Sequence, residues 1–351
     1  MTISMRKQVG AACALLCIAL SGCGGKTGNA NVEAGMEAIA ALDYQRAMEC
    51  FEAARENGEN ERLIARGMGI ASMGMTDYSS AAAYLEECLS YSDGMIKEID
   101  YDVNFYLAAA HCKNGDYVQA EEIYTAILTL KTREPDAGFL RGNARLELGR
   151  LEQALEDFEC VIAMLPEDYD RLIDIYEVLA AHGYNEKGEE YLRTALQERA
   201  EKMSSYDRGR IYYYLGEYQQ ACLNLEDAKK ADTADVYLYL GKSYEATEDY
   251  NYAIRNVYEA YLNGHEGDAR LYNQLGLCHM HQKDYEAALT AFQKAMNIPD
   301  NGMMQTLQFN EAVAYEFLGE YTKAAALINS YLQTYPDDET AVREFGFLST
   351  R

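Results

Sequence analysis

The chain has no tryptophan among its 351 residues, whereas tyrosine occurs 30 times. Aromatic packing must therefore use mainly a side chain whose hydroxyl can face water. Basic residues are also scarce, with 31 lysines and arginines against 57 acidic residues and a formal net charge of −26. Because phosphate backbones bind cationic surfaces, we expect no nucleic-acid partner. The excess acid instead predicts a solvated, self-repelling surface that keeps an elongated chain soluble.

The sequence also lacks the patterns that usually carry catalysis or hold a metal ion. It has no HExxH, no phosphate-binding glycine loop and no nucleophile-elbow pentapeptide. His279 and His281 are two residues apart on a predicted helix, so they point to different faces. Asp168, Asp170 and Asp174 fit a helix start better than a calcium loop, which needs a glycine and a terminal glutamate. We predict no catalytic residue, no metal site and no cofactor.

No pair of cysteines has the CxxC spacing of a zinc or redox site. Three of the 9 cysteines lie in the first 23 residues, and the others are widely scattered over predicted helices. A free thiol on a helix behaves as a small hydrophobe, so we interpret the scattered cysteines as packing residues. They are Cys50, Cys88, Cys112, Cys160, Cys222 and Cys278.

The N-terminal segment has the features of an export signal. Arg6 and Lys7 precede an apolar run, residues 9–20, that is too short to span a bilayer. The following Leu-Ser-Gly-Cys, ending at Cys23, resembles the lipobox of bacterial lipoproteins. That resemblance implies removal of residues 1–22, lipidation of Cys23 and anchoring at the outer face of a bacterial membrane. An ordinary secretory signal with a chance cysteine is the alternative.

One pattern recurs along the rest of the chain. It is an aromatic residue, a small residue three positions later and a bulky residue four beyond that, as in Tyr218, Ala221 and Leu225. Another small residue, usually glycine, lies twelve positions before most of the small residues. The small residues are 34, 39, 34, 34, 33, 32, 35 and 36 positions apart. They are Ala47, Ala81, Ala120, Ala154, Gly188, Ala221, Ala253, Ala288 and Ala324.

This pattern predicts repeated pairs of antiparallel helices. Small residues on facing stripes let two helices approach closely, while aromatic and bulky residues fill the space beside them. A single pair leaves apolar surface exposed, so stability requires neighbouring pairs to stack. The fifth unit departs most from the pattern, with Asn185 in the aromatic position and Gly188 in place of alanine. We expect it to be looser or to have a displaced helix boundary.

The spacing and the residue pattern resemble those of tetratricopeptide repeat proteins. The resemblance implies an all-α, right-handed superhelical solenoid of about nine repeats over residues 31–336. A lipidated linker, residues 23–30, would precede the solenoid, and a C-terminal capping helix, residues 337–351, would follow it.

In that family, partner peptides usually lie against the first helix of each repeat, on the concave side. The resemblance therefore implies a peptide-binding groove lined by Arg66, Phe105, Phe139, Asn143, Tyr206, Arg210, Tyr213, Tyr239, Lys242 and Asn273. Arg210 and Lys242 form a potential positive spot among tyrosines, and our hypothesis is that it holds a carboxylate of an extended peptide. The alternative is that the two cations only neutralise nearby acids such as Asp207 and Glu245.

Together these features predict a membrane-anchored, non-catalytic scaffold whose partner is a protein or peptide. One alternative is an assembly factor for envelope machinery, such as outer-membrane protein insertion, a pilus or a secretion system. Another is an enzyme subunit with an unrecognised site.

Overall fold

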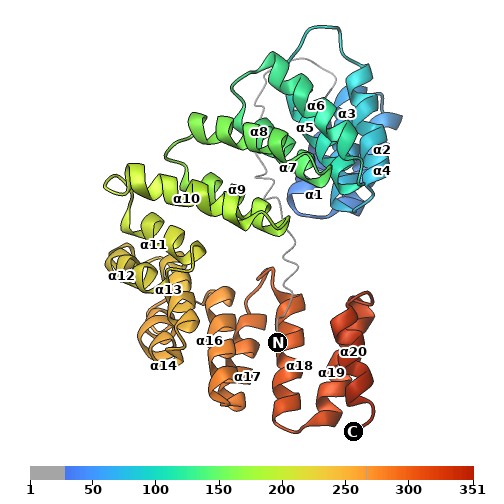
Figure 1. Ribbon diagram of the computed structural model, residues 1–351. Coiled ribbons are helices and arrows are strands. Elements are labelled where there is room, and N and C mark those ends of the chain that lie inside the picture. The colour runs from blue at the N-terminus through green and yellow to red at the C-terminus, as the bar shows by residue number, and fades with distance from the viewer. Residues whose placement is uncertain (1–27, 266) are drawn as a thin grey trace. The chain divides into compact units, whose positions relative to one another are not determined.

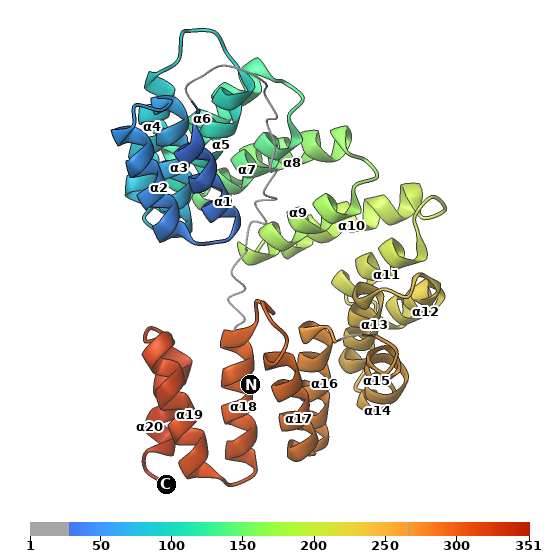
Figure 2. The same cartoon turned by 180° about the vertical axis from the view of Figure 1, so that it is seen from behind.

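The computed structural model describes residues 28–265 and 267–351 (Figures 1 and 2). The predicted export signal and Cys23 lie outside these residues. The described residues form helices joined by short turns, and no strand occurs among them. They group into two compact units, one ending at Ala137 and one running from Gly138 to Arg351. Across the same residues, no helix combines the length and the apolar character that crossing a bilayer would require.

The first unit contains three helical hairpins. In each hairpin the two helices pack against each other, and each hairpin packs against the next. The helices are α1 (Ala30–Ala40), α2 (Tyr44–Glu56), α3 (Glu61–Gly74), α4 (Tyr78–Ser90), α5 (Glu98–Lys113) and α6 (Tyr117–Leu130).

The second unit continues the alternation of first and second helices. Its first three hairpins pair α7 (Pro135–Glu147) with α8 (Leu151–Met164), α9 (Tyr169–Ala181) with α10 (Asn185–Arg199), and α11 (Ser205–Tyr214) with α12 (Tyr218–Ala228). The short turn η1 (Lys229–Ala231) follows α12. The next hairpin pairs α13 (Ala234–Ala246) with a second helix made of α14 (Tyr250–Tyr252), the π-helical turn η2 (Ala253–Tyr258) and α15 (Glu259–Leu262). The remaining helices are α16 (Ala269–Gln282), α17 (Tyr285–Met296), α18 (Met304–Phe317), α19 (Tyr321–Thr334) and α20 (Glu339–Leu348).

The boundaries of the second helices follow the repeat pattern. Each begins at the aromatic position three residues before the small residue, as at Tyr44, Tyr117 and Tyr285. Glycines before these helices adopt positive φ angles, 84° at Gly115 and 72° at Gly216, which close the turn without steric cost. In the fifth hairpin α10 also begins at this position, Asn185. The expectation of a displaced boundary there was therefore wrong.

The hairpin core also follows the pattern. Eight of the nine small positions are alanines with no solvent exposure, from Ala47 to Ala324. In five hairpins the glycine of the first helix faces the bulky residue of its own second helix. A Cβ added to Gly35 would lie 2.5 Å from the ring of Phe51, and one on Gly276 would lie 2.4 Å from Phe292. This close approach confirms the predicted helical-hairpin fold.

The described cysteines are free thiols. Cys88, Cys222 and Cys278 are buried in the core, as expected of packing residues. Cys160 is exposed on α8, so its interpretation as a packing residue was wrong. Its position beside the buried Phe158 and Val161 did not reveal that its own side chain faces solvent.

Candidate binding face

Within each unit, successive first helices contact one another: α1 with α3, α9 with α11, α11 with α13, and α13 with α16. We call the surface that these helices share the first-helix face. The predicted groove residues all lie on first helices. They are Arg66 on α3, Phe105 on α5, Phe139 and Asn143 on α7, Tyr206, Arg210 and Tyr213 on α11, Tyr239 and Lys242 on α13, and Asn273 on α16.

In the first unit, the predicted groove residues take part in contacts between neighbouring helices. Arg66 Nε donates a hydrogen bond to Asp102 Oδ2 of α5 at 2.5 Å, and Arg62 pairs in the same way with Asp100. The Phe105 ring lies 6.2 Å from the Tyr124 ring of its own hairpin. The charge of Arg66 is therefore already compensated by a carboxylate of the next hairpin.

At the start of the second unit, Phe139 is 9 % exposed and packs against Phe158, with 6.1 Å between the ring centroids. The guanidinium of Arg171 from α9 covers it at 4.4 Å from the ring centroid. Asn143 is half-buried on the same helix. Phe139 is thus chiefly a core residue, and little of its ring remains for a ligand.

Arg210 is buried, with 8 % of the residue exposed, and it is paired on two sides. Its Nη1 donates to Asp170 of α9, and its Nη2 donates to Asp207 at 2.8 Å. The guanidinium also lies 4.4 Å from the centroid of the Tyr206 ring. Burial opposes the charge of Arg210, but the hydrogen bonds to the two carboxylates outweigh that cost and raise its pKa.

Around Arg210 lies a group of rings, here called the tyrosine cluster, made of Tyr206, Tyr213, Tyr214 and Tyr239. Tyr239 lies 6.2 Å from Tyr206 and 5.5 Å from Tyr213 between ring centroids, both in edge-on geometry. Tyr214 donates to Glu177 Oε1 at 2.9 Å, and its oxygen lies 3.1 Å from that of Tyr239. The cluster therefore joins α9, α11 and α13 into one rigid surface.

Two hydroxyls of the tyrosine cluster remain open. Those of Tyr206 and Tyr213 make no hydrogen bond with any residue in the part of the chain that the structure describes. Both side chains are only half-buried. Burial raises the pKa of each to about 12, so both stay protonated near neutral pH and can donate to a ligand.

Next along the face, Lys242 lies near a carboxylate that points into the hairpin. Glu245 accepts a hydrogen bond from the buried Tyr258, and its pKa also responds to Cys278. Burial raises the pKa of Glu245, against the lowering effects of Tyr258, Cys278 and the charge of Lys242. Lys242 thus acts on the Glu245 carboxylate electrostatically.

Polar contacts continue between the later first helices. Asn310 Nδ2 of α18 donates to Asn273 Oδ1 of α16 at 2.9 Å, and Asn273 is only 4 % exposed. Arg270 of α16 donates from Nη1 to Asp235 of α13 at 2.7 Å. Asn273 therefore links two repeats, and its side-chain oxygen already accepts a hydrogen bond.

Family models for the tetratricopeptide repeat match residues 66–137, 269–298 and 307–338. The segment 66–137 runs from within α3 to the start of α7, and the other two correspond to the hairpins α16–α17 and α18–α19. The chain is a tetratricopeptide repeat protein. The repeat array supports a role as a scaffold for protein–protein interaction, because stacked repeats present extended binding surfaces.

Several solved structures resemble this tetratricopeptide repeat protein at low sequence identity. A tetratricopeptide repeat protein from Parabacteroides merdae ATCC 43184 is 18% identical, with 71% of this chain and 98% of that chain covered and a TM-score of 0.45. MamA from Desulfovibrio magneticus RS-1 is 16% identical, with coverage of 51% and 99% and a TM-score of 0.42. Human IFIT1, solved as a dimer with PPP-AAAA, is 14% identical, with coverage of 90% and 85% and a TM-score of 0.41.

The contacts of Arg210 bear directly on the two interpretations of the positive spot. Its pairing with Asp207 is the one that the neutralising alternative expected, and Asp170 adds a second carboxylate. Sequence reasoning assigned Asp170 only to a helix start, although it pairs with Arg210 across 40 residues. It did not identify Glu177 and Tyr214, which pair across 37 residues. A search for polar residues about one repeat apart on first helices could have found these pairs. The binding role of the predicted groove residues stays a prediction.

Proposed function

We propose that this tetratricopeptide repeat protein is a lipid-anchored, non-catalytic scaffold that holds an extended polypeptide on the first-helix face around α11 and α13. The observation that carries the proposal is the pair of open hydroxyls, on Tyr206 and Tyr213, set on half-buried rings. Aromatic side chains with a free polar end are typical of binding hot spots, because they bury large area at little entropic cost.

The frame behind the two tyrosines supports the proposal. Arg210, Tyr239 and Tyr214 are held by contacts to neighbouring helices, so a ligand would meet a surface that is already ordered. Such preorganisation reduces the entropy lost on binding.

The charge around the tyrosine cluster indicates the kind of partner. The Arg210 guanidinium is matched by Asp170 and Asp207, and Glu177 adds a further carboxylate. Asp170 keeps 77% of its side chain exposed. An extended peptide that carries basic residues therefore suits this face better than the carboxylate-bearing ligand of the sequence-based hypothesis.

The decisive experiment is crosslinking in intact cells followed by mass spectrometry, with recovered partners retested against variants. We expect Tyr206→Ala with Tyr213→Ala to weaken binding of the recovered partner at least about tenfold. Tyr91→Ala is the matched control, because Tyr91 is an exposed tyrosine in the first unit. Equal binding by both variants would refute the assignment of this face. Recovery of pilus, secretion or protein-insertion components would specify the function as envelope assembly.

The lipid anchor is a separate part of the proposal and is supported by the lipobox resemblance at Cys23. We expect labelled fatty acid to be incorporated into the wild-type chain and not into Cys23→Ser. In cell fractionation, the wild-type chain should remain with membranes while the variant is released. A Cys23→Ser chain that stays membrane-bound and acylated would exclude this anchor.

A further inference from the structure

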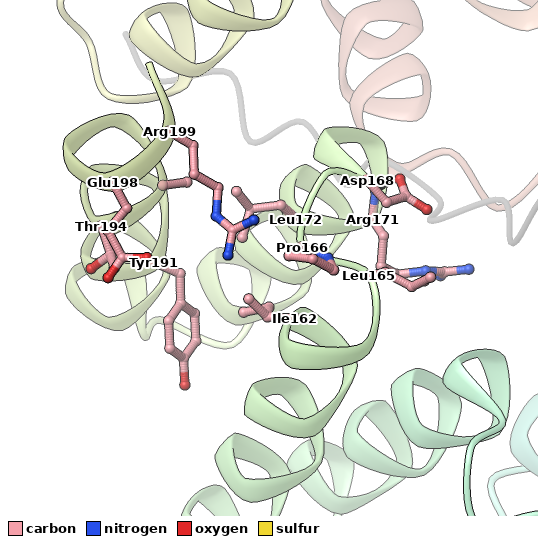
Figure 3. Close-up of a pocket in the computed structure, with 11 residues that line it drawn as sticks. Ile162, Leu165, Pro166, Asp168, Arg171, Leu172, Tyr191, Thr194, Glu198 and Arg199 are labelled. Carbon is pink, nitrogen blue, oxygen red and sulfur yellow. Dashed lines mark hydrogen bonds between the residues drawn. The ribbon is translucent and has the colours of Figure 1, made fainter. Parts of the chain in front are cut away.

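A small cavity lies at the junction of the fourth and fifth hairpins, and none of its lining residues belongs to the tyrosine cluster. We call it the edge pocket. It is formed by the end of α8, the turn into α9 and the C-terminal half of α10, and it has a volume of about 80 Å³ (Figure 3). Its walls are mainly apolar and consist of Ile162, Leu165, Pro166, Leu172, Tyr191 and Ala195.

One charged side chain points into the edge pocket. Figure 3 shows the Arg199 guanidinium between Leu172 and Ile162, over the apolar floor. Arg199 makes no side-chain hydrogen bond or ion pair with any residue among 28–265 and 267–351. In a chain of net charge −26, a half-buried arginine without such a partner is unusual.

The other charged residues at the edge pocket are directed elsewhere. Asp168 caps α9 by accepting from the backbone N–H of Arg171 at 2.9 Å. Arg171 turns away, covers Phe139 and pairs with Asp174 at 3.5 Å. Glu198 lies at the rim beside Thr194. The pocket thus combines an apolar interior with one cation that still has hydrogen-bond donors to offer.

We propose that the edge pocket binds the C-terminal residue of a polypeptide, with its apolar side chain inside and its terminal carboxylate on Arg199. A guanidinium next to an apolar surface suits a carboxylate that is attached to a hydrophobic group. The size limits that group, because one water needs roughly 10–15 Å³ of such volume and the pocket would hold about six waters. That space suits one leucine-sized side chain, and its volume is too small to enclose the whole acyl chain of a lipid. This inference does not depend on the proposed function of the first-helix face.

The rim allows a polypeptide to leave the pocket. Thr194 and Glu198 are both exposed on α10, so the chain before the terminal residue can pass over them. Glu198 lines this edge and is exposed, so its carboxylate can accept a backbone N–H of such a chain, a group that a fatty acid does not have.

The test uses a photo-crosslinking peptide and the full-length chain. The probe is an acetylated glycine-serine peptide ending in photo-leucine with a free carboxylate, and its partner probe is the same peptide with a C-terminal amide. We expect the free acid to crosslink to α8, α9 and α10 around Ile162, Leu172 and Ala195. The amide should label this site about tenfold less, as expected for the loss of one charge-assisted hydrogen bond.

Variants separate the pocket from non-specific labelling. Arg199→Gln should reduce labelling by the free acid about tenfold, whereas Arg199→Lys should retain part of it. Ala195→Phe should fill the pocket and abolish labelling, with circular dichroism confirming that the helices remain. Arg193→Gln is the matched control, because Arg193 lies on the same helix and pairs with Glu217 outside the pocket.

Three results would overturn the proposal. The first is equal labelling by the acid and the amide, and the second is unchanged labelling of Arg199→Gln. The third is competition by decanoate at lower concentration than by the unlabelled peptide acid, which would assign the pocket to an acyl carboxylate instead. Loss of labelling in Arg199→Gln and Ala195→Phe, with Arg193→Gln unchanged, would establish it.

Discussion

The ring of Tyr258 lies against Gly241, so close that a Cβ on this glycine would stand 2.1 Å from Cζ of the tyrosine. In other hairpins the residue four positions after the small alanine occupies this place, and in this hairpin that residue is Val257. The π-helical turn η2 holds one more residue than an α-helical turn, so Tyr258 takes the place instead. Its hydroxyl then reaches Glu245 of α13.

This contact predicts opposite effects for two glycine-to-alanine substitutions. Gly241→Ala forces a methyl group into the buried Tyr258 ring and should lower the free energy of unfolding by about 1–3 kcal/mol. Gly346→Ala on α20 meets no atom within 4 Å and should raise it by roughly 0.5–1 kcal/mol, because alanine favours the helix. Urea unfolding of both variants measures the difference. Destabilisation by Gly346→Ala, or none by Gly241→Ala, would contradict the packing described.

Arg210 should contribute more to the stability of the fold than a surface arginine does, because it is buried and pairs with two carboxylates. Arg210→Ala deprives Asp207 of its guanidinium partner, leaving it the hydrogen bond from Ser204, and removes one of the ties between α9 and α11. We expect a loss of about 2 kcal/mol in the free energy of unfolding, a value that allows for the exposure of Asp170. Arg193→Ala, which breaks an exposed pair with Glu217, should cost less than about 1 kcal/mol. Similar losses in thermal or urea unfolding of the two variants would argue against this role.

The packing of the final helix, α20, should be less stable above neutral pH than in acid. Burial, a hydrogen bond with Glu344 of α20 and the charge of Glu344 raise the pKa of Glu316 on α18 from 4.5 to about 7, while Arg351 lowers it. A carboxyl that binds its proton more tightly in the folded chain stabilises the fold fully below pH 4.5, and that contribution is lost as the pH rises to about 7.

We therefore expect hydrogen exchange in α20 to quicken between pH 4.5 and 7, after correction for the intrinsic pH dependence of exchange. Glu316→Gln should remove this change, because the amide cannot ionise. Glu286→Gln, an exposed glutamate on α17, should leave it in place. A pH dependence that persists in Glu316→Gln would assign it to other groups.

The described thiols should differ sharply in reactivity. Cys160 is exposed and should react quickly with iodoacetamide in the native protein. Burial raises the pKa of Cys222 to about 11 and that of Cys278 further, so their thiolates are rare and shielded. Mass spectrometry after timed alkylation should find Cys222 and Cys278 modified only after unfolding. Rapid native alkylation of Cys278 would show that the seventh and eighth hairpins open readily.

Much of the fold could be predicted because the repeat pattern is local. The helix starts at Tyr44, Tyr117 and Tyr285 follow from a fixed offset to a small residue in the same hairpin. The candidate site was less predictable. Phe139 and Asn273 were placed correctly on first helices, but their burial depends on neighbours from other repeats, Arg171 and Asn310.

The sequence by itself determined the period, the pairing of helices and the small residues at which helices meet, since each depends on residues within about one repeat. Only the tertiary structure decided which side chains bind to neighbouring repeats and which remain available to a ligand. Arg210 meets Asp170 across 40 residues, and the hydroxyls of Tyr206 and Tyr213 have no such partner among the residues that the structure describes. It also decided that Tyr258 fills the place of Val257, because the extra residue of the π-helical turn η2 brings the tyrosine ring against Gly241 and its hydroxyl to Glu245.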